Sequence, residues 1–232
     1  MRIMFSIDGK LWGFLSKMAD LILVNVFFLI FSIPVVTIGA SKAALYDVSR
    51  RIRRDEESSI FKNFFCSFRD NFKKATIVWL LYVISMVIVG INVYACMLIE
   101  MGWMTTVFMM IAMMVLFVVN ITFIYTIMLL IHYNDSIKIS LLMGCGLAIA
   151  NLPFTIVMIL MESVLLILLF FYTHYWMYIL TFFVIIGFSL IEFINSYLFD
   201  KIVKRISNYG ELKMGRDGDG QESETFLEND LY

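Results

Sequence analysis

Charged residues are scarce in this chain. They account for 16% of its 232 residues, whereas 61% are hydrophobic, and the mean hydropathy is +0.88. A soluble domain carries roughly 25% charged and roughly 45 to 50% apolar residues, and a core of this size cannot hide the excess of Phe and Met. The composition therefore excludes most soluble globular proteins and indicates an integral membrane protein.

Residues typical of catalytic and metal sites are also few. The three cysteines are far apart and lack the CxxC spacing of metal and redox sites. His132 and His174 are expected at opposite ends of spans, on opposite faces of the membrane, so they cannot share a metal ion. The motifs GxSxG, HExxH and Walker A are absent. We therefore expect no metal, no cofactor and no enzymatic activity.

Long uncharged stretches mark the membrane spans, because about 20 apolar residues at a rise of ~1.5 Å cross a hydrocarbon core of about 30 Å. They predict an all-α, polytopic bundle with about five spans in one membrane domain, residues 1–209. The last uncharged region needs two spans, joined at the aromatic residues 172–176, whose rings suit the headgroup level. The spans are expected at residues 20–41, 76–99, 104–131, 140–171 and 177–199.

Lysine and arginine are concentrated between the first two spans, and such residues are retained on the cytoplasmic side of a membrane. Residues 42–74 carry nine of the 18 in the chain. With five spans, this segment and the C-terminal tail face the cytoplasm, and the N-terminus lies outside. A second arrangement stays open, because Pro34 interrupts the first span. A re-entrant hairpin there would leave four true spans and place every basic residue inside.

Residues 42–74 are expected to form a cytoplasmic amphipathic helical module. Its first helix continues the first span, and its second helix places five phenylalanines on one face at spacings of three and four. A basic helix with an aromatic stripe suits the membrane interface; the alternatives are packing on the spans and docking of a partner. This candidate lipid or partner surface comprises Arg50, Arg51, Arg53, Arg54, Phe61, Phe64, Phe65, Phe68, Phe72, Lys73 and Lys74.

A candidate polar site within the membrane centres on Glu162, which is expected near the middle of the bilayer. An ionised carboxylate there costs several kcal/mol or more, so it must be protonated, paired or in contact with water. No lysine or arginine shares its span, which favours the protonated form. The functional interpretation is a proton or cation site with Asn151 and Asn120 nearby. The alternative is a neutral side chain hydrogen-bonded between helices.

Three other residues complete this candidate site. Glu192 is expected near the cytoplasmic end of the last span, where it pairs with Lys201 or Lys42. Asn25 precedes Pro34 by nine residues, and the proline frees a backbone carbonyl that neighbouring helices or water must satisfy. This pair indicates either a structural kink or a binding site in a broken helix.

Several blocks of the sequence resemble one protein family. They are residues 21–25, IPVVTIGAS at 33–41, ALY at 44–46 and FFxxFxxNFKxAT at 64–76, with a weaker fit to about residue 200. These blocks look like the signature of the YesL family of bacterial integral membrane proteins of unknown function. The resemblance implies a multi-pass protein of the bacterial cell membrane, often encoded beside carbohydrate ABC importers. It implies no catalytic residues.

The balance of charge along the chain indicates a membrane surface as partner and not nucleic acid. Residues 210–232 hold seven of the 19 acidic residues, so the rest of the chain is net basic. The acidic segment has few apolar groups and cannot bury enough surface to fold. We expect a disordered cytoplasmic tail there.

Two functions fit these features. The first is a non-catalytic accessory or scaffolding subunit of carbohydrate uptake, with membrane lipids, ABC importer components or further copies of itself as partners. The second is a small solute or proton-coupled transporter or channel acting as an oligomer, which Glu162 and Pro34 favour. Five spans without an obvious internal repeat weigh against transport by a monomer.

Overall fold

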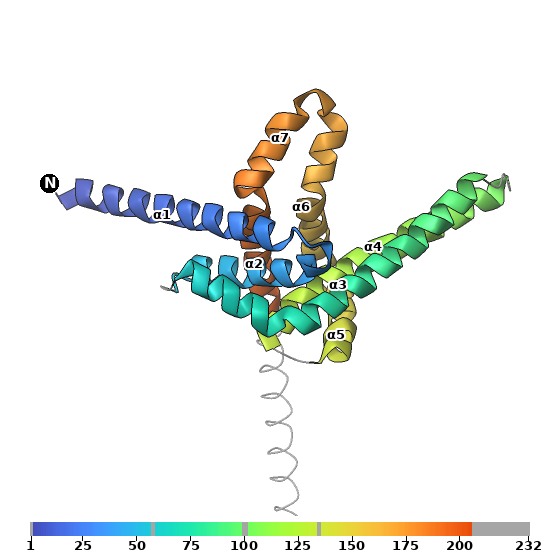
Figure 1. Ribbon diagram of the computed structural model, residues 1–232, viewed down its shortest axis with the longest axis horizontal. Coiled ribbons are helices and arrows are strands. Elements are labelled where there is room, and N and C mark those ends of the chain that lie inside the picture. The colour runs from blue at the N-terminus through green and yellow to red at the C-terminus, as the bar shows by residue number, and fades with distance from the viewer. Residues whose placement is uncertain (1, 57–58, 99–101, 134–135, 206–232) are drawn as a thin grey trace, which may run out of the picture. The chain divides into compact units, whose positions relative to one another are not determined.

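The computed structural model describes residues 2–56, 59–98, 102–133 and 136–205, which are almost entirely helical and contain no strand (Figure 1). Five helical segments are long and apolar enough to cross a membrane: Trp12–Phe31, Ile60–Cys96, Trp103–Tyr133, Leu152–Phe171 and Thr173–Arg205. These segments confirm the prediction of an all-α polytopic bundle and are those of a multi-pass membrane protein. The chain divides into two units, Met1–Ser196 and Tyr197–Tyr232, and the first holds every contact discussed below.

The helices follow one another with short connections. In chain order they are α1 (Arg2–Phe31), the 3₁₀ turn η1 (Val35–Thr37), α2 (Ile38–Arg53), α3 (Ile60–Leu98), α4 (Trp103–Tyr133), α5 (Ile137–Ala150), α6 (Leu152–Phe171), the 3₁₀ turn η2 (Thr173–Tyr175), α7 (Trp176–Phe182) and the π-helical turn η3 (Phe183–Gly187). Residues 188–205 are again α-helical. α3 and α4 run side by side as a hairpin, and α6 and α7 form a second antiparallel hairpin that is joined by η2 (Figure 1).

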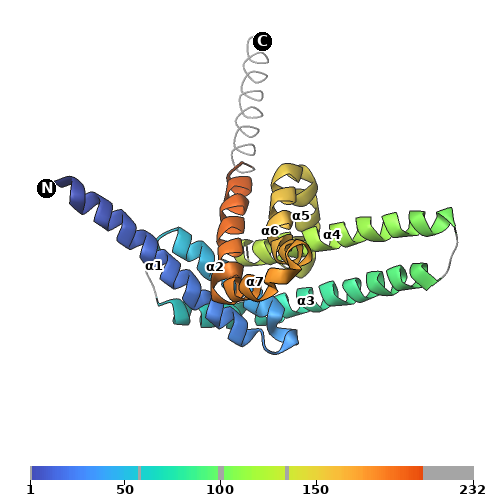
Figure 2. The same ribbon diagram turned by 90° about the horizontal axis from the view of Figure 1, so that it is seen from above.

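The first span ends earlier than expected. α1 stops at Phe31, because Pro34 has no N–H with which to continue the helix. The Thr37 hydroxyl donates within the turn to the carbonyls of Phe31 and Pro34, at 2.6 and 2.7 Å. α2 then runs back alongside α1 (Figure 2). The expectation that one helix continues from the first span into this segment is therefore wrong.

An ion pair joins the two arms of this hairpin. Lys17 Nζ on α1 lies 2.8 Å from Asp55 Oδ1, just after α2. A first span that separates residue 17 from residues 42–74 by the thickness of a bilayer conflicts with this contact. The pair agrees with the re-entrant hairpin that the interruption at Pro34 left open.

Residues 42–74 contain two helices, as expected, but the second does not end with the segment. α2 is buried over most of its length, and residues 60–74 are the first part of α3, which continues to Leu98 because no proline or glycine interrupts it before the apolar stretch. At ~1.5 Å per residue, the 39 residues of α3 extend roughly 58 Å. That length exceeds a hydrocarbon core of about 30 Å, so part of α3 lies beyond it.

The single span expected over residues 140–171 is divided into α5 and α6. The break falls at Asn151, two residues before Pro153, whose ring disfavours a continuous helix. The Thr155 hydroxyl bridges the break with hydrogen bonds to the carbonyls of Ala148 and Asn151, at 2.9 and 3.0 Å. α6 alone is one of the five apolar segments, whereas α5 is too short to be counted among them.

α2 and α3 approach most closely at Gly39. A Cβ atom there would meet the Cβ of Trp79 and would lie 2.5 Å from the carbonyl oxygen of Ala75. Trp79 on α3 also holds the start of α2 in place, because its indole N–H donates to the carbonyl of Val35, in the turn before α2, at 2.8 Å. Only glycine at residue 39 allows this separation of the two helices.

We expect Gly39→Ala to lower the free energy of unfolding by about 1–3 kcal/mol, the usual cost of overpacking a close contact. Unfolding of the purified protein in detergent micelles measures the effect. Gly90→Ala is the matched control, because a Cβ at residue 90 has nothing within 4 Å and alanine favours helix. Equal stability of the two variants would contradict the close approach at Gly39.

Candidate functional site

Three ionisable side chains meet where α2, α6 and the helix after η3 come together. Lys42 Nζ lies 2.7 Å from Glu162 Oε2 and 3.4 Å from Glu192 Oε1. The Asn195 amide also donates to Glu162 Oε1 at 3.3 Å. We call these four residues the ion cluster. Its lysine and two glutamates are largely buried, with side-chain exposures of 17%, 23% and 4%.

Lys42 reaches the cluster because α2 lies inside the bundle. Ala40, Ala43 and Ala44 surround it along that helix, and their small side chains let the other helices approach closely. The ammonium also lies 5.7 Å from the centre of the Phe123 ring, within the range of a cation–π contact. Burial by itself lowers the pKa of Lys42, but the attraction of the two carboxylates outweighs it, so the pKa lies above its usual value. The lysine is therefore charged.

The structure gives Glu162 a partner that its own span lacks. The sequence favoured a protonated side chain, because no cation lies on the same span. Lys42, 120 residues away along the chain, forms a hydrogen-bonded ion pair with it instead. Of the two partners expected for Glu192, Lys42 is the one seen in contact. Lys42 was expected only as a partner of Glu192, and no local pattern links either Lys42 or Asn195 to Glu162.

A small cavity adjoins the ion cluster. It measures about 90 Å³ and is lined by Lys42, Glu162 and Glu192 together with apolar residues that include Phe28 and Phe183. A water molecule takes about 30 Å³ in the liquid, so the cavity is large enough for water. Sites for small organic ligands measure about 300–1,000 Å³, and this cavity falls well below that range.

Asn25 holds a distorted turn of another helix. Its amide donates to the carbonyls of Phe183 and Val184, at 3.0 and 2.7 Å, and its oxygen accepts from the N–H of Ser189 at 3.0 Å. These groups lie in or next to η3, where a π-helical turn disturbs the regular hydrogen-bond ladder. Asn25, which is fully buried, therefore clamps η3 and is not a partner of Glu162.

The other predicted polar residues lie elsewhere. Pro34 lies in the turn between α1 and α2, and Asn151 lies at the junction of α5 and α6. Asn120 accepts a hydrogen bond from the Tyr82 hydroxyl at 3.0 Å and donates to a carbonyl of its own helix. Of the five residues proposed for one polar site, the structure brings only Glu162 and Glu192 together.

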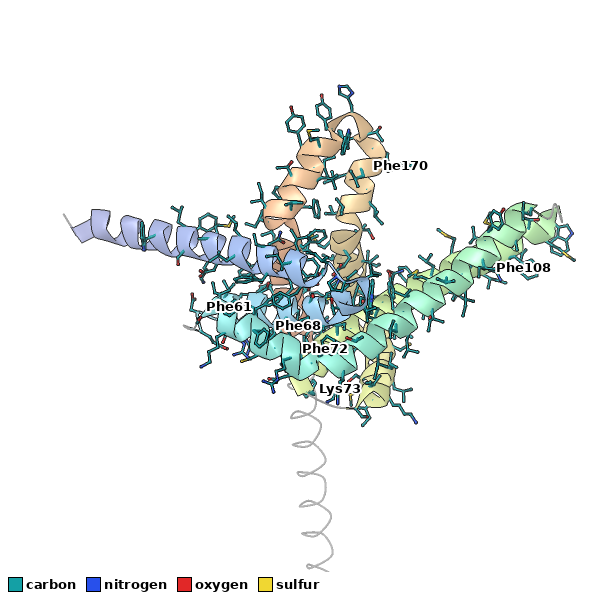
Figure 3. All side chains as sticks on the ribbon, viewed as in Figure 1. Phe61, Phe68, Phe72, Lys73, Phe108 and Phe170 are labelled. Atoms are coloured by element: carbon teal, nitrogen blue, oxygen red, sulfur yellow. The ribbon has the colours of Figure 1, made fainter. Side chains whose placement is uncertain are left out.

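The aromatic stripe on α3 packs in part against α1. Phe64 is buried between the rings of Phe27 and Phe31, with centroid separations of 5.9 and 5.5 Å. Phe61 contacts the ring of Phe27 and Phe65 contacts the ring of Phe31, but they remain 58% and 44% exposed. Figure 3 shows the stripe along the start of α3. Packing on the spans therefore accounts for its buried side, and its exposed side stays available to lipid or a partner.

Two larger cavities lie near the basic ends of α2 and α3. One measures about 380 Å³ and is lined by residues of α1, α2 and α3, and the other measures about 270 Å³ and reaches α4. The second is mainly polar, and both share Arg51 and Asn63. The Arg51 guanidinium is bound to Asp47 at 3.1 Å, so neither cavity is a simple basic pocket. In the described part of the chain, no group of three His, Cys, Asp or Glu side chains is arranged to hold a metal.

Residues 21–93 match the model of a family described as protein of unknown function, DUF624. No curated protein and no solved structure matches the chain. The matched region contains the last third of α1, all of α2, most of α3, and the sequence blocks that resemble YesL. It includes Lys42 but ends before both glutamates of the ion cluster. The predicted tail, residues 210–232, lies outside the described residues.

Proposed function

We propose that this chain is a YesL-like, non-catalytic accessory or scaffolding subunit of the bacterial cell membrane that associates with an ABC-type carbohydrate importer. The closed ion cluster is the observation that carries the non-transporting role. Its charges are bound to one another, and the adjoining cavity of about 90 Å³ is too small for a sugar. The link to carbohydrate uptake rests on the resemblance to YesL.

The outer surface supplies two kinds of contact in this proposal. The long helices expose apolar side chains suited to lipid, among them Phe108 at 47% and Phe170 at 79% (Figure 3). The exposed basic and aromatic side of α3 is the proposed contact for the importer component. Lys73 lies there, beyond the residues that pack on α1. A second copy of the chain is the alternative partner for this side.

We propose further that both termini and the α2–α3 connection face the cytoplasm. The positive-inside tendency favours the cytoplasmic side for the arginines at the end of α2. The Lys17–Asp55 ion pair keeps the start of the first apolar segment close to these arginines, and therefore on the same side. α1 and α2 then form a re-entrant hairpin, and four spans cross the bilayer. A reporter fused at residue 1 that is active only outside the cell would overturn this arrangement.

Affinity purification from gently solubilised membranes tests the accessory role. We expect the wild-type chain to recover a component of a carbohydrate importer, and Lys73→Glu to recover at least several-fold less. Lys138→Glu is the matched control, because it reverses another exposed lysine, which lies on α5 and not on α3. Recovery of no importer component by the wild-type chain would overturn the proposal.

Proton-coupled transport is the second candidate function, favoured by two buried carboxylates that share one lysine. It predicts that Glu162→Gln abolishes solute flux in reconstituted vesicles. Unchanged flux in that variant would remove the main reason for this candidate.

A further inference from the structure

The ion cluster contains one more acid than base. Both Glu162 and Glu192 contact Lys42, and no other lysine or arginine of the described residues contacts either carboxylate. With both glutamates ionised the cluster carries a net charge of −1. An uncompensated buried charge is unfavourable because the protein interior replaces little of its hydration. We therefore expect the cluster to bind one further positive charge.

The neighbouring helices do not supply this charge. α1 contributes the apolar Phe28 to the adjoining cavity, and α4 contributes the Phe123 ring beneath Lys42. From α3, the Tyr82 hydroxyl lies near the cluster but donates its proton to Asn120. The amide of Asn195 is neutral. A proton is the smallest group that neutralises the cluster.

The contacts distinguish the two carboxylates. Both oxygens of Glu162 are occupied, one by Lys42 at 2.7 Å and the other by Asn195 at 3.3 Å, and such donors stabilise the ionised form. Glu192 has the longer contact of 3.4 Å with Lys42, is 4% exposed and contacts the same ammonium group as Glu162. Two ionised carboxylates repel each other, whereas a carboxylic acid donates to a carboxylate.

We propose that the ion cluster is a proton-binding site that holds one proton on Glu192, shared by hydrogen bonding with Glu162. A hydronium ion transfers its proton to the Glu192 carboxylate, which leaves one water molecule and changes the cluster from −1 to neutral. The adjoining cavity of about 90 Å³ is large enough for the water that carries this proton. The proposal does not depend on the accessory role, because a proton site is compatible with either proposed function.

Infrared spectroscopy of the full-length protein in lipid vesicles tests the proposal, because a protonated carboxylic acid has a carbonyl stretch that shifts in D₂O. At neutral pH we expect one such buried group in the wild-type chain. Glu192→Gln removes the carboxyl group that carries the proton, so this variant should lose the band. Glu162→Gln leaves one carboxylate, Glu192, paired with one ammonium, Lys42, so the proton is no longer needed and this variant should lose the band as well. Glu56→Gln is the matched control at an exposed glutamate and should keep it.

A titration of the wild-type protein keeps the test independent of whether the variants fold. We expect the band to decrease as the pH rises and to be indifferent to Na⁺ or K⁺ at constant ionic strength. The absence of a buried acid band at neutral pH, or its persistence in folded Glu192→Gln protein, would overturn the proposal. So would a band that Na⁺ or K⁺ removes at constant pH, because the cluster would then hold a metal cation in place of the proton.

Discussion

Replacement of Lys42 by methionine is expected to lower the free energy of unfolding by about 3–5 kcal/mol, the cost of removing one partner from a buried ion pair. Methionine keeps an unbranched side chain of similar length, so the main loss is the charge. The carboxyl groups of Glu162 and Glu192 then remain in a buried site without the lysine cation. Unfolding of the purified variant in detergent micelles measures the loss.

Lys17→Met is the matched control, because Lys17 also pairs with a carboxylate, but at an exposed site. Asp55, its partner, is 73% exposed, and exposed pairs contribute about 0–1 kcal/mol. A second comparison removes all three charges with Lys42→Met, Glu162→Gln and Glu192→Gln together. We expect this triple variant to be more stable than Lys42→Met alone, because no unpaired charge remains. If Lys42→Met is no more harmful than Lys17→Met, the cluster does not stabilise the fold.

Replacement of Asn25 by leucine is expected to lower the free energy of unfolding by about 3 kcal/mol or more. The variant loses three buried hydrogen bonds, to Phe183, Val184 and Ser189. Each backbone group left without a partner costs about 1–3 kcal/mol, and the π-helical turn has no regular ladder from which to replace them. Thermal unfolding in detergent measures the global effect, and amide hydrogen exchange at residues 183–189 reports the local one.

Asn92→Leu is the matched control for this substitution. Asn92 is exposed on α3, in an apolar stretch, and its contact is with Cys96 on the same helix. Substitutions away from buried networks usually change stability by about 0.5 kcal/mol or less. Equal effects of the two leucine variants, or unchanged exchange across η3 in Asn25→Leu, would show that Asn25 does not hold the π-helical turn.

The sequence predicts the helices of this protein better than their connections. Apolar runs are local, and each helix satisfies its own backbone hydrogen bonds, so the class and the apolar segments follow from composition and length. The breaks are marked by Pro34 and Pro153, yet only the first was interpreted as an interruption. The length of the uncharged run over 140–171 favoured one span, and the junction at Asn151 divides it.

The direction that the chain takes after each break could not be predicted from the residues next to the break. The first span ends at Phe31, and a proline there is compatible with a kink as well as with a reversal. The packing of α2 against α1 and α3, with Gly39 at the closest approach, selects the reversal. The basic segment that was expected to project from the membrane is buried in part for the same reason.

The sequence by itself determined that this protein is a helical membrane protein, that its charges are few, and that Glu162 needs a partner, a proton or water. Only the tertiary structure decided that the partner is Lys42 and that Glu192 and Asn195 join it. Helix formation and hydrophobic length depend on residues close together in the chain, whereas a buried charge is neutralised by whichever group the packing brings to it. For Glu162 that group lies 120 residues away.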